Sequence, residues 1–566
     1  MQFIPIKTAF ENVFSGDIKI IKNETIQTIN YCKMLLSEME KSKNFPDKKK
    51  LFFEYYFITT YYSKLINILK ITNTNEKYDN FINETDKLIE NFISDYFSKK
   101  ETFQTIIEIK KNLDKMKHDE IYFFNNLIDK LKNYTKTNNK IKTSMNNIID
   151  EINAKIDSEN NSSLLEKLIC YRKEQATLFG FKNYFSFAKR HEILNQNEIA
   201  TLITDLNNKL DKSSSEEIKK TNNNNNIFNI FFNNLDLDLC IENLFKYIEE
   251  FYNIKIIKNT NSFLNSEKYV IYYKENILGN LFLNLFNENN KVSKPICIHI
   301  NHSYRDIDSN FHNKNIAIFA NFKKNKFYHY ELILFAREIG TALLFLFCDS
   351  TIGNITFRDN FYLINSKILE NICWEKDFLK KIVNNNEEIN KIISMRFFNF
   401  ATQTKLKFVN IFFDHIIHSS DEIIEELNKY KKYDGSVLLM LYSKLFDNIF
   451  SKQLKLFKKH NRENEINEIK KINKNIFLQE INGNECSFYE LLIIDIISTE
   501  IYKLLKNNGN IEKYLKIIIQ AGTQKFKLLL NKFVGNINNV NYLDFVLNYG
   551  KKEGEIIIDN KSNIVF

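Results

Sequence analysis

Residues 331–348 read ELILFAREIGTALLFLFC, and residues 359–376 read DNFYLINSKILENICWEK. The first segment is apolar nearly all the way round a helix, a pattern typical of a helix at the centre of a large core. Its middle nevertheless holds a group of polar residues and a glycine: Arg337, Glu338, Gly340 and Thr341. Arg337 and Thr341 are four residues apart and therefore share one helical face. Because buried polar groups need partners, this helix is predicted to line a functional site.

ELILFAREIGTALLFL resembles the active-site helix of the thimet oligopeptidase and oligopeptidase F family of zinc peptidases, which carries H-E-F-G-H. In H-E-x-x-H the two histidines bind zinc from one helical face, and the glutamate is the general base on the zinc-bound water. The resemblance puts Arg337 and Thr341 at the two histidine positions and Glu338 at the base position. The third ligand precedes the glutamate of the family's L-E-N-W by seven residues, which is the position of Leu363. The resemblance thus implies that all three zinc ligands are missing, and we expect no zinc cofactor.

Other segments extend the resemblance, in order, over roughly residues 160–550. YRKEQATLFGFKNYFSFAKRHEI (171–193) is similar to R-x-E-x-A-x-L-L-G-Y-K-N-Y-A-E-Y-S, and KKYDGSVLLMLYSKLFDNIF (431–450) to G-Y-x-A-x-Y-Y-x-Y-L-W-S. In the family, tyrosines of the second segment and a nearby histidine stabilise the oxyanion of the tetrahedral intermediate. Tyr433 keeps the first tyrosine position, whereas Val437 and Leu438 replace the tyrosine pair.

The pattern of apolar residues predicts a mainly α protein with a small sheet. Short β-rich runs occur at 269–286, 294–300 and 315–322, and they match the family's sheet beside the active-site helix. The resemblance implies a two-lobed, zincin-type helical fold of the thimet oligopeptidase type around a deep channel. We expect an N-terminal helical region over 1–160 and a peptidase-like domain over 161–566. Within the latter, the polar, low-complexity stretch 213–226 is predicted to be a linker in a surface loop.

The amino-acid composition of the chain narrows the classes of partner and the cellular compartment that we expect. A net charge of +9 over 566 residues is mild, so no nucleic-acid partner is expected. Seven scattered cysteines without a C-x-x-C pair favour reduced thiols. The first residues lack the pattern of a secretory signal, and no apolar run is long enough for a membrane span. We therefore expect a cytoplasmic protein that has no membrane partner.

The remaining polar groups leave several roles open. Without a metal, Glu338 has no activated water and is expected to be inert, held by a structural contact such as a nearby cation. Arg337 could bind a peptide carbonyl or a terminal carboxylate, or it could form a buried ion pair with Glu338, Glu331 or Glu370. Thr341 can bond the carbonyl one turn back. A relocated metal site could use histidines of the strand region and its flanks: His299, His302, His312 and His329.

These observations predict a catalytically inactive relative of the peptidases that binds peptides or a protein partner through the former substrate channel. Arg337, Thr341 and Tyr433 are the candidate binding residues. One alternative is a structural or regulatory interaction protein with a vestigial channel. Another is an active metallo-oligopeptidase that holds its metal at a non-standard site.

Overall fold

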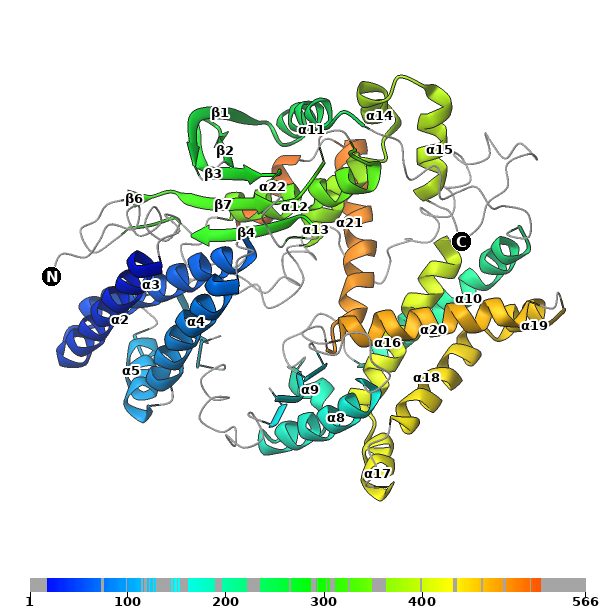
Figure 1. Cartoon of the computed structure of the whole chain (residues 1–566), viewed down its shortest axis with the longest axis horizontal. Helices are drawn as coiled ribbons and strands as arrows, with labels where there is room; N and C mark the ends of the chain where they lie inside the picture. The colour runs from blue at the N-terminus through cyan, green and yellow to red at the C-terminus, as the bar shows by residue number, and fades with distance from the viewer. Residues whose placement is uncertain are drawn as a thin grey trace. The chain divides into compact units, whose positions relative to one another are not determined.

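Helices make up most of the chain, and a small sheet interrupts them in its middle (Figure 1). The structure is a computed structural model that describes residues 18–72, 76–97, 99–112, 116, 120–121, 123–125, 127–128, 144–145, 147–149, 151–152, 161–188, 196–220, 235–263, 266–286, 292, 294–301, 303–305, 311–323, 326–348, 363–396, 400–430, 435–459, 462–481, 485–508 and 511–520. The chain divides into two units. The first comprises Met1–Tyr134, Phe231–Asn386 and Ile497–Asn538; the second comprises Thr135–Ile230, Glu387–Ile496 and Asn539–Phe566. The boundary expected near residue 160 stays a prediction.

The first unit contains a five-stranded sheet with the order β1-β2-β3-β7-β4. Its strands are β1 (Ile254–Phe263), β2 (Ser266–Tyr273), β3 (Asn276–Asn284), β4 (Ile296–Asn301) and β7 (Lys314–Phe319). β7 runs parallel to β3, and β4 pairs antiparallel with β7 at the edge. A separate two-stranded ribbon joins β5 (Tyr304–Arg305) to β6 (Phe311–His312). The predicted β-rich runs are therefore confirmed as strands of one small sheet.

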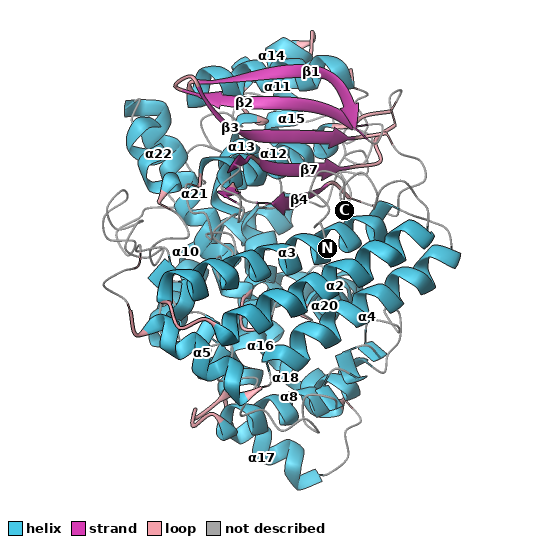
Figure 2. Cartoon of the chain, turned by 90° about the vertical axis from the view of Figure 1, so that its left-hand side faces the viewer, coloured by secondary structure: helices cyan, strands magenta, loops and turns pink. Residues whose placement is uncertain are grey.

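Both faces of this sheet pack against helices of the same unit. One face packs on α12 (His329–Phe347), which contacts β3, β7 and β4. Side chains alternate between the faces of a strand. The opposite face supplies Phe282, Ile300, Ala317 and Phe319 to a core shared with the N-terminal helices. These helices are α2 (Ile18–Lys41), α3 (Phe45–Thr72) and α4 (Glu76–Phe97); α3 lies beside β4, and α2 and α4 pack on α3 (Figure 2).

A second core in this unit is rich in aromatic side chains, some of them from α3. Phe52 and Tyr55 are fully buried, and they pack with Phe123, Phe124 and Tyr96. α5 (Lys100–Lys110) contributes Ile106 and Ile109 to the same cluster. Other aromatic residues of α3, such as Phe53 and Tyr56, are partly buried against this cluster.

Further helices of the first unit lie near the sheet and α12. These are α11 (Leu237–Tyr252), α13 (Leu363–Ile372), α14 (Lys376–Ile382) and α22 (Ile511–Ile519). α13 packs along α12, and α22 also contacts α12. The buried side-chain amide of Asn365 on α13 forms hydrogen bonds with three neighbouring helices, α11, α22 and α12. Its Oδ1 accepts hydrogen bonds from Tyr252 (2.6 Å) and Tyr514 (3.2 Å), and its Nδ2 donates to the carbonyl oxygen of Gly340 (2.7 Å).

The second unit is helical throughout its described residues. Its helices are α8 (Asn161–Leu178), α9 (Tyr184–Ala188), α10 (Gln196–Lys220), α15 (Asn386–Arg396), α16 (Phe400–Ser419), α17 (Asp421–Tyr430), α18 (Ser436–Ile449), α19 (Ser451–Lys459), α20 (Glu463–Glu480) and the first turns of α21 (Phe488–Asn508). Glu166 of α8 caps α18, because its carboxylate accepts from the backbone N–H groups of Gly435 (2.9 Å) and Leu438 (3.2 Å). Gly435 has φ 81°, and a Cβ there would lie 2.7 Å from Ser162, so the position requires glycine.

The prediction of a surface loop over residues 213–226 is wrong for the first part of this segment. Residues up to Lys220 continue α10, and the remainder lies outside the described residues. The polar residues have partners on the neighbouring helices. Glu217 accepts from the backbone N–H groups of Ala401 and Thr402 (both 2.9 Å) at the start of α16, and Ser214 accepts from Gln453 (2.7 Å). Composition alone cannot reveal such tertiary partners.

Two sequence expectations concern the whole chain. All seven cysteines are free, and five of them are buried. Among the helices that the structure describes, none is both long and apolar enough to span a bilayer.

Candidate functional site

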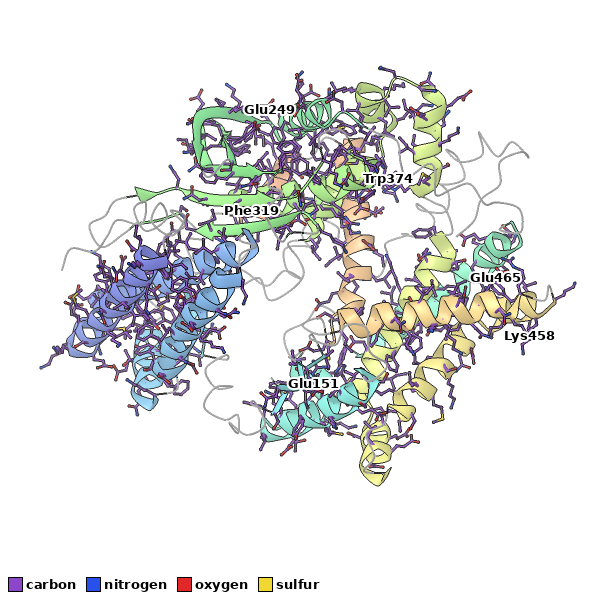
Figure 3. All side chains as sticks on the ribbon, viewed as in Figure 1. Glu151, Glu249, Phe319, Trp374, Lys458 and Glu465 are labelled. Atoms are coloured by element: carbon purple, nitrogen blue, oxygen red, sulfur yellow. The ribbon has the colours of Figure 1, made fainter. Side chains whose placement is uncertain are left out.

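The site predicted on α12 lies where this helix packs on α13. Gly340 permits the close approach, because a Cβ there would lie 2.6 Å from both the carbonyl oxygen of Asn365 and the Cα of Ser366. Beyond α13, Trp374 packs edge-on against His329 at the start of α12, with ring centroids 4.6 Å apart; Figure 3 labels this tryptophan. The Nε2 of His329 lies 2.9 Å from the carbonyl oxygen of Cys373. The two helices therefore form one tightly packed pair.

Arg337 forms an ion pair across this helix pair. Its Nε donates to Oε2 of Glu370 at 2.8 Å, and Lys367 Nζ lies 3.1 Å from the same oxygen. Two cations thus meet one carboxylate. Glu370 is one of the three partners that the sequence allows for Arg337. The pair is only partly buried, because the side chain of Arg337 is 35% exposed and that of Glu370 19% exposed.

Thr341 and Ser366 join the same two helices by their hydroxyl groups, whose oxygens lie 2.6 Å apart. Thr341 Oγ1 also donates to the carbonyl oxygen of Arg337 at 3.2 Å, the local bond that the sequence predicts. Leu363 is the first residue of α13, one turn before Ser366. Ser366 and Lys367 were not predicted as site residues. The i, i+3 spacing of Lys367 and Glu370 was the available signal.

Glu338 points in another direction, toward the edge strand of the sheet. Its Oε2 accepts a hydrogen bond from the backbone N–H of Cys297 in β4 at 2.7 Å. Burial raises the pKa of the Glu338 carboxyl to about 7, although this hydrogen bond and the charge of Arg337 both lower it. The sequence suggests a cation as the structural partner of Glu338. Among the described residues, its hydrogen-bond donor is instead a backbone amide.

His299 lies further along β4, on the same strand as Cys297. Its Nδ1 lies 2.9 Å from Nζ of Lys64 on α3, and its ring lies 5.1 Å from that of Phe345 on α12. Burial lowers the pKa of Lys64 to about 8. Burial also lowers the pKa of His329 to about 4. His302 and the side chain of His312 lie outside the described residues.

The residues at the three positions where the resemblance expects zinc ligands do not fit a zinc ion. A guanidinium is always protonated and has no lone pair to donate, and the leucine side chain has no donor atom. Arg337 and Thr341 are moreover bonded to α13. The residues that the structure describes place three metal-ligand types together at one location, Asp414, His418 and Cys486, in the second unit.

That second-unit cluster is part of a buried hydrogen-bond network. Arg172 Nη1 lies 3.0 Å from Nε2 of His418. Because a guanidinium only donates, Nε2 accepts, and Nδ1–H donates to Asp414 Oδ1 at 3.0 Å. The same Asp414 oxygen accepts from the backbone N–H of Cys486 at 3.0 Å. Both imidazole nitrogens of His418 therefore take part in hydrogen bonds within the protein.

The segment that resembles the family's tyrosine segment lies in the second unit. Val437 and Leu438 are buried in the first turn of α18. Tyr433, the third candidate binding residue, lies outside the described residues. Its role stays a prediction.

Comparisons with known proteins agree on the family. The model of peptidase family M3 matches residues 142–544. A search of curated proteins finds no match. Three of the similar solved structures carry the titles "PZ PEPTIDASE A with inhibitor 2", "Crystal structure of a putative oligoendopeptidase F from Bacillus anthracis str. Ames" and "Crystal structure of M32 carboxypeptidase from Deinococcus radiodurans R1".

The likeness to these structures concerns the fold. The first is 12% identical with a TM-score of 0.60, covering 99% of each chain. The second is 13% identical with a TM-score of 0.55, covering 99% of this chain and 98% of the other. The third is 9% identical with a TM-score of 0.60, covering 88% of this chain and 97% of the other. The mostly helical zincin-type fold is thereby confirmed, and the chain belongs to peptidase family M3.

Proposed function

We propose that this member of peptidase family M3 does not hydrolyse peptides and instead binds them through its former catalytic face. That face consists of α12, α13 and the edge strand β4. The proposal combines two parts, the loss of metal chemistry and the retention of a surface suited to extended chains. They rest on different residues and can be tested separately.

The observation that carries the first part is the ion pair of Arg337 and Glu370. Arg337 occupies the first ligand position with a positive charge, which repels a dication. Thr341, at the second position, shares a short hydroxyl contact with Ser366. Glu338 keeps the identity of the general base, but without a metal it faces no water whose pKa has been lowered from 15.7 to about 7. Its carboxylate accepts a backbone hydrogen bond instead.

The second part is supported by the position of β4 at the edge of the sheet. An edge strand can pair with an added strand through its outward backbone groups, which is a common mode of peptide recognition. Arg337 of α12 and Lys367 of α13 add positive charge to the same face, and their side chains are 35% and 25% exposed. A peptide would therefore find both backbone partners and a counter-charge on this face.

The proposal is tested on the purified full-length chain. Metal analysis should find no stoichiometric zinc, because no residue at the three ligand positions can hold it. Quenched fluorescent peptides should remain uncleaved at neutral pH, with or without added zinc. A pool of mixed-sequence hexapeptides should form complexes detectable by native mass spectrometry. About one zinc per chain together with chelator-sensitive cleavage would contradict the first part. Absence of any peptide complex would contradict the second and favour an interaction protein that uses other surfaces.

A second candidate is an active metallopeptidase with a non-standard metal site. The cluster of Asp414, His418 and Cys486 is the observation in its favour. Binding a cation there would displace Arg172 from His418 or remove the Nδ1 proton that Asp414 accepts. All three residues are also buried, which leaves no access for a substrate. We therefore rank this candidate second.

A further inference from the structure

The aromatic core of the N-terminal helices encloses three hydroxyl groups that form no hydrogen bond with any residue the structure describes, those of Tyr55, Tyr96 and Thr102. The three residues are 0%, 4% and 1% exposed, so bulk water does not solvate these groups. The buried hydroxyl of Tyr62 on α3, in contrast, donates to the carbonyl oxygen of Ile21 at 3.2 Å. A buried hydroxyl without a partner is costly, and native proteins contain few of them. Three in one core therefore indicate a bound polar group.

These hydroxyls come from different helices and lie close together. α2, α3, α4 and α5 pack side by side (Figures 1 and 2). The rings of Tyr55 on α3 and Tyr96 on α4 have centroids 5.2 Å apart. Burial raises the pKa of Tyr96, and the nearby hydroxyl of Thr102 on α5 partly offsets this shift, although the two oxygens lack normal hydrogen-bond geometry. Burial also raises the pKa of Tyr55, and the Cys32 thiol on α2 and the Tyr96 phenol raise it further.

The chemistry of this cluster selects a small neutral ligand. Burial raises the pKa of the Cys32 thiol to about 12, and the phenols are likewise held in their neutral form, so they are poor metal ligands. The carboxylates of Glu54 and Glu40 raise the pKa of Cys32 and Tyr96, respectively, and their charge disfavours an anion. Aromatic rings pack around Tyr55 and leave it fully buried; they belong to Phe52, Phe92 and Phe97. Water is small and neutral, and when buried it typically makes about three hydrogen bonds.

We propose that one ordered water molecule lies in the core between α3, α4 and α5 and bridges the hydroxyls of Tyr55, Tyr96 and Thr102. Water has two donors and two acceptor positions, so it can satisfy all three groups. It joins three helices by hydrogen bonds inside a core that is otherwise apolar, and it fixes α4 and α5 against α3. This site is independent of the proposed peptide binding.

The test removes one hydroxyl at a time from the full-length protein, with little change in side-chain volume, by Tyr55→Phe, Tyr96→Phe and Thr102→Val. With a bridging water, each variant loses a hydrogen bond and leaves the water with fewer partners. The opening equilibrium constant of these helices should then rise roughly fivefold in each. In a dry core each substitution would remove an unsatisfied group, so the helices would open less. Hydrogen exchange of peptides from α3, α4 and α5, followed by mass spectrometry, measures the sign and size of the change.

Tyr62→Phe is the matched control on α3, because its hydroxyl has protein partners and its loss should speed exchange in either case. Slower or unchanged exchange in any of the three test variants would overturn the bridging water. If Tyr96 and Thr102 bond each other directly, Tyr55→Phe alone gives that result.

A high-resolution crystal structure provides the second readout. It should show a density peak about 2.5–3.0 Å from the oxygens of at least two of the three hydroxyls. A well-ordered core without such a peak would overturn the proposal.

Discussion

Gly340 of α12 and Asn365 of α13 are in contact in two ways. The side-chain amide of Asn365 donates to the carbonyl oxygen of Gly340 at 2.7 Å, and a Cβ at Gly340 would lie 2.6 Å from the carbonyl oxygen of Asn365. The hydrogen bond satisfies a backbone acceptor inside α12, a helix whose residues are mostly buried. The missing Cβ allows the two backbones to approach. Both features fix the distance between the helices that carry Arg337 and Glu370.

We expect Gly340→Ala to destabilise the protein despite the better helix propensity of alanine. The propensity gain is about 1 kcal/mol. The added methyl group meets backbone atoms of α13, which cannot rotate away, and overpacking of this kind typically costs about 1–3 kcal/mol or more. Urea denaturation should therefore give a lower free energy of unfolding than the parent protein has.

Gly180→Ala is the matched control for this experiment. Gly180 has φ +79°, and nothing lies within 4 Å of a Cβ built there. Its substitution therefore introduces backbone strain of about 1 kcal/mol without a clash. A Gly340→Ala variant that is as stable as the parent would show that α12 and α13 can separate.

The central helix and the sheet could be predicted from the sequence because their patterns are local. The apolar run indicates α12, and the three short β-rich runs indicate β2, β3, β4 and β7 without reference to the rest of the chain; β1 has no such run. The partners of the site residues could not be predicted in the same way. Glu338 bonds a backbone amide 41 residues earlier, and Arg337 could be assigned only to a set of three carboxylates.

The stability of the protein should depend on pH through Glu338. Its folded pKa, about 7, lies above the ordinary value of 4.5, so the folded state binds more protons than the unfolded state between these pH values. The contribution of Glu338 to the free energy of unfolding is therefore fully present below about pH 4.5 and decreases as the pH rises to 7. Because the group is partly exposed, we expect a change on the order of 1–2 kcal/mol.

Glu338→Gln provides the measurement. Relative to the parent protein, the Gln variant should be more stable at pH 8 than at pH 4.5, because it carries no charge at either pH. Urea denaturation of both proteins at the two pH values isolates this group from all others. If the difference in free energy of unfolding between the Gln variant and the parent is the same at both pH values, the pKa of Glu338 is not raised by folding.

The expected assignment of the ligand positions can be tested by placing ligand side chains there. Arg337→His, Thr341→His and Leu363→Glu together should give the chain a measurable affinity for zinc, because these side chains supply two imidazoles and a carboxylate. The affinity should remain modest, since Ser366 and Glu370 keep their present positions. Isothermal titration with zinc measures it, with Arg337→His alone as the control. A folded triple variant that binds no better than the single variant would show that the alignment of these positions is wrong.

The first residues of the segment 213–226 are helical and make tertiary contacts that cannot be inferred from the composition of the segment. Glu217 accepts two backbone N–H groups at the start of α16 and the hydroxyl of Thr402 at 2.7 Å. Glu217→Ala leaves these donors without an acceptor and should cost about 1–2 kcal/mol, the range for loss of a helix cap. Thermal melting measures the effect, and exposed Glu216→Ala is the control. Equal melting temperatures for the two variants would contradict the capping role.

The network around Arg172 gives a test of the alternative metal site. Arg172 is 1% exposed, lies 3.0 Å from Nε2 of His418 and pairs with Glu485 at 3.3 Å. Arg172→Met leaves His418 and Glu485 without this buried charge and should lower the free energy of unfolding by about 3 kcal/mol. Because the guanidinium uses the lone pair of His418 and repels cations, we expect the parent protein not to bind zinc at this cluster.

Zinc added to the parent protein should therefore raise its melting temperature no more than it raises that of Cys486→Ser. A ligand that binds only the folded state stabilises it by RT ln(1 + [L]/Kd), so a zinc site would separate the two proteins by a difference that grows with zinc concentration. Such a difference, lost in Cys486→Ser and in His418→Gln, would place a metal at Asp414, His418 and Cys486. It would also require that Arg172 move away from His418, because a single imidazole nitrogen cannot accept from arginine and bind a metal at once.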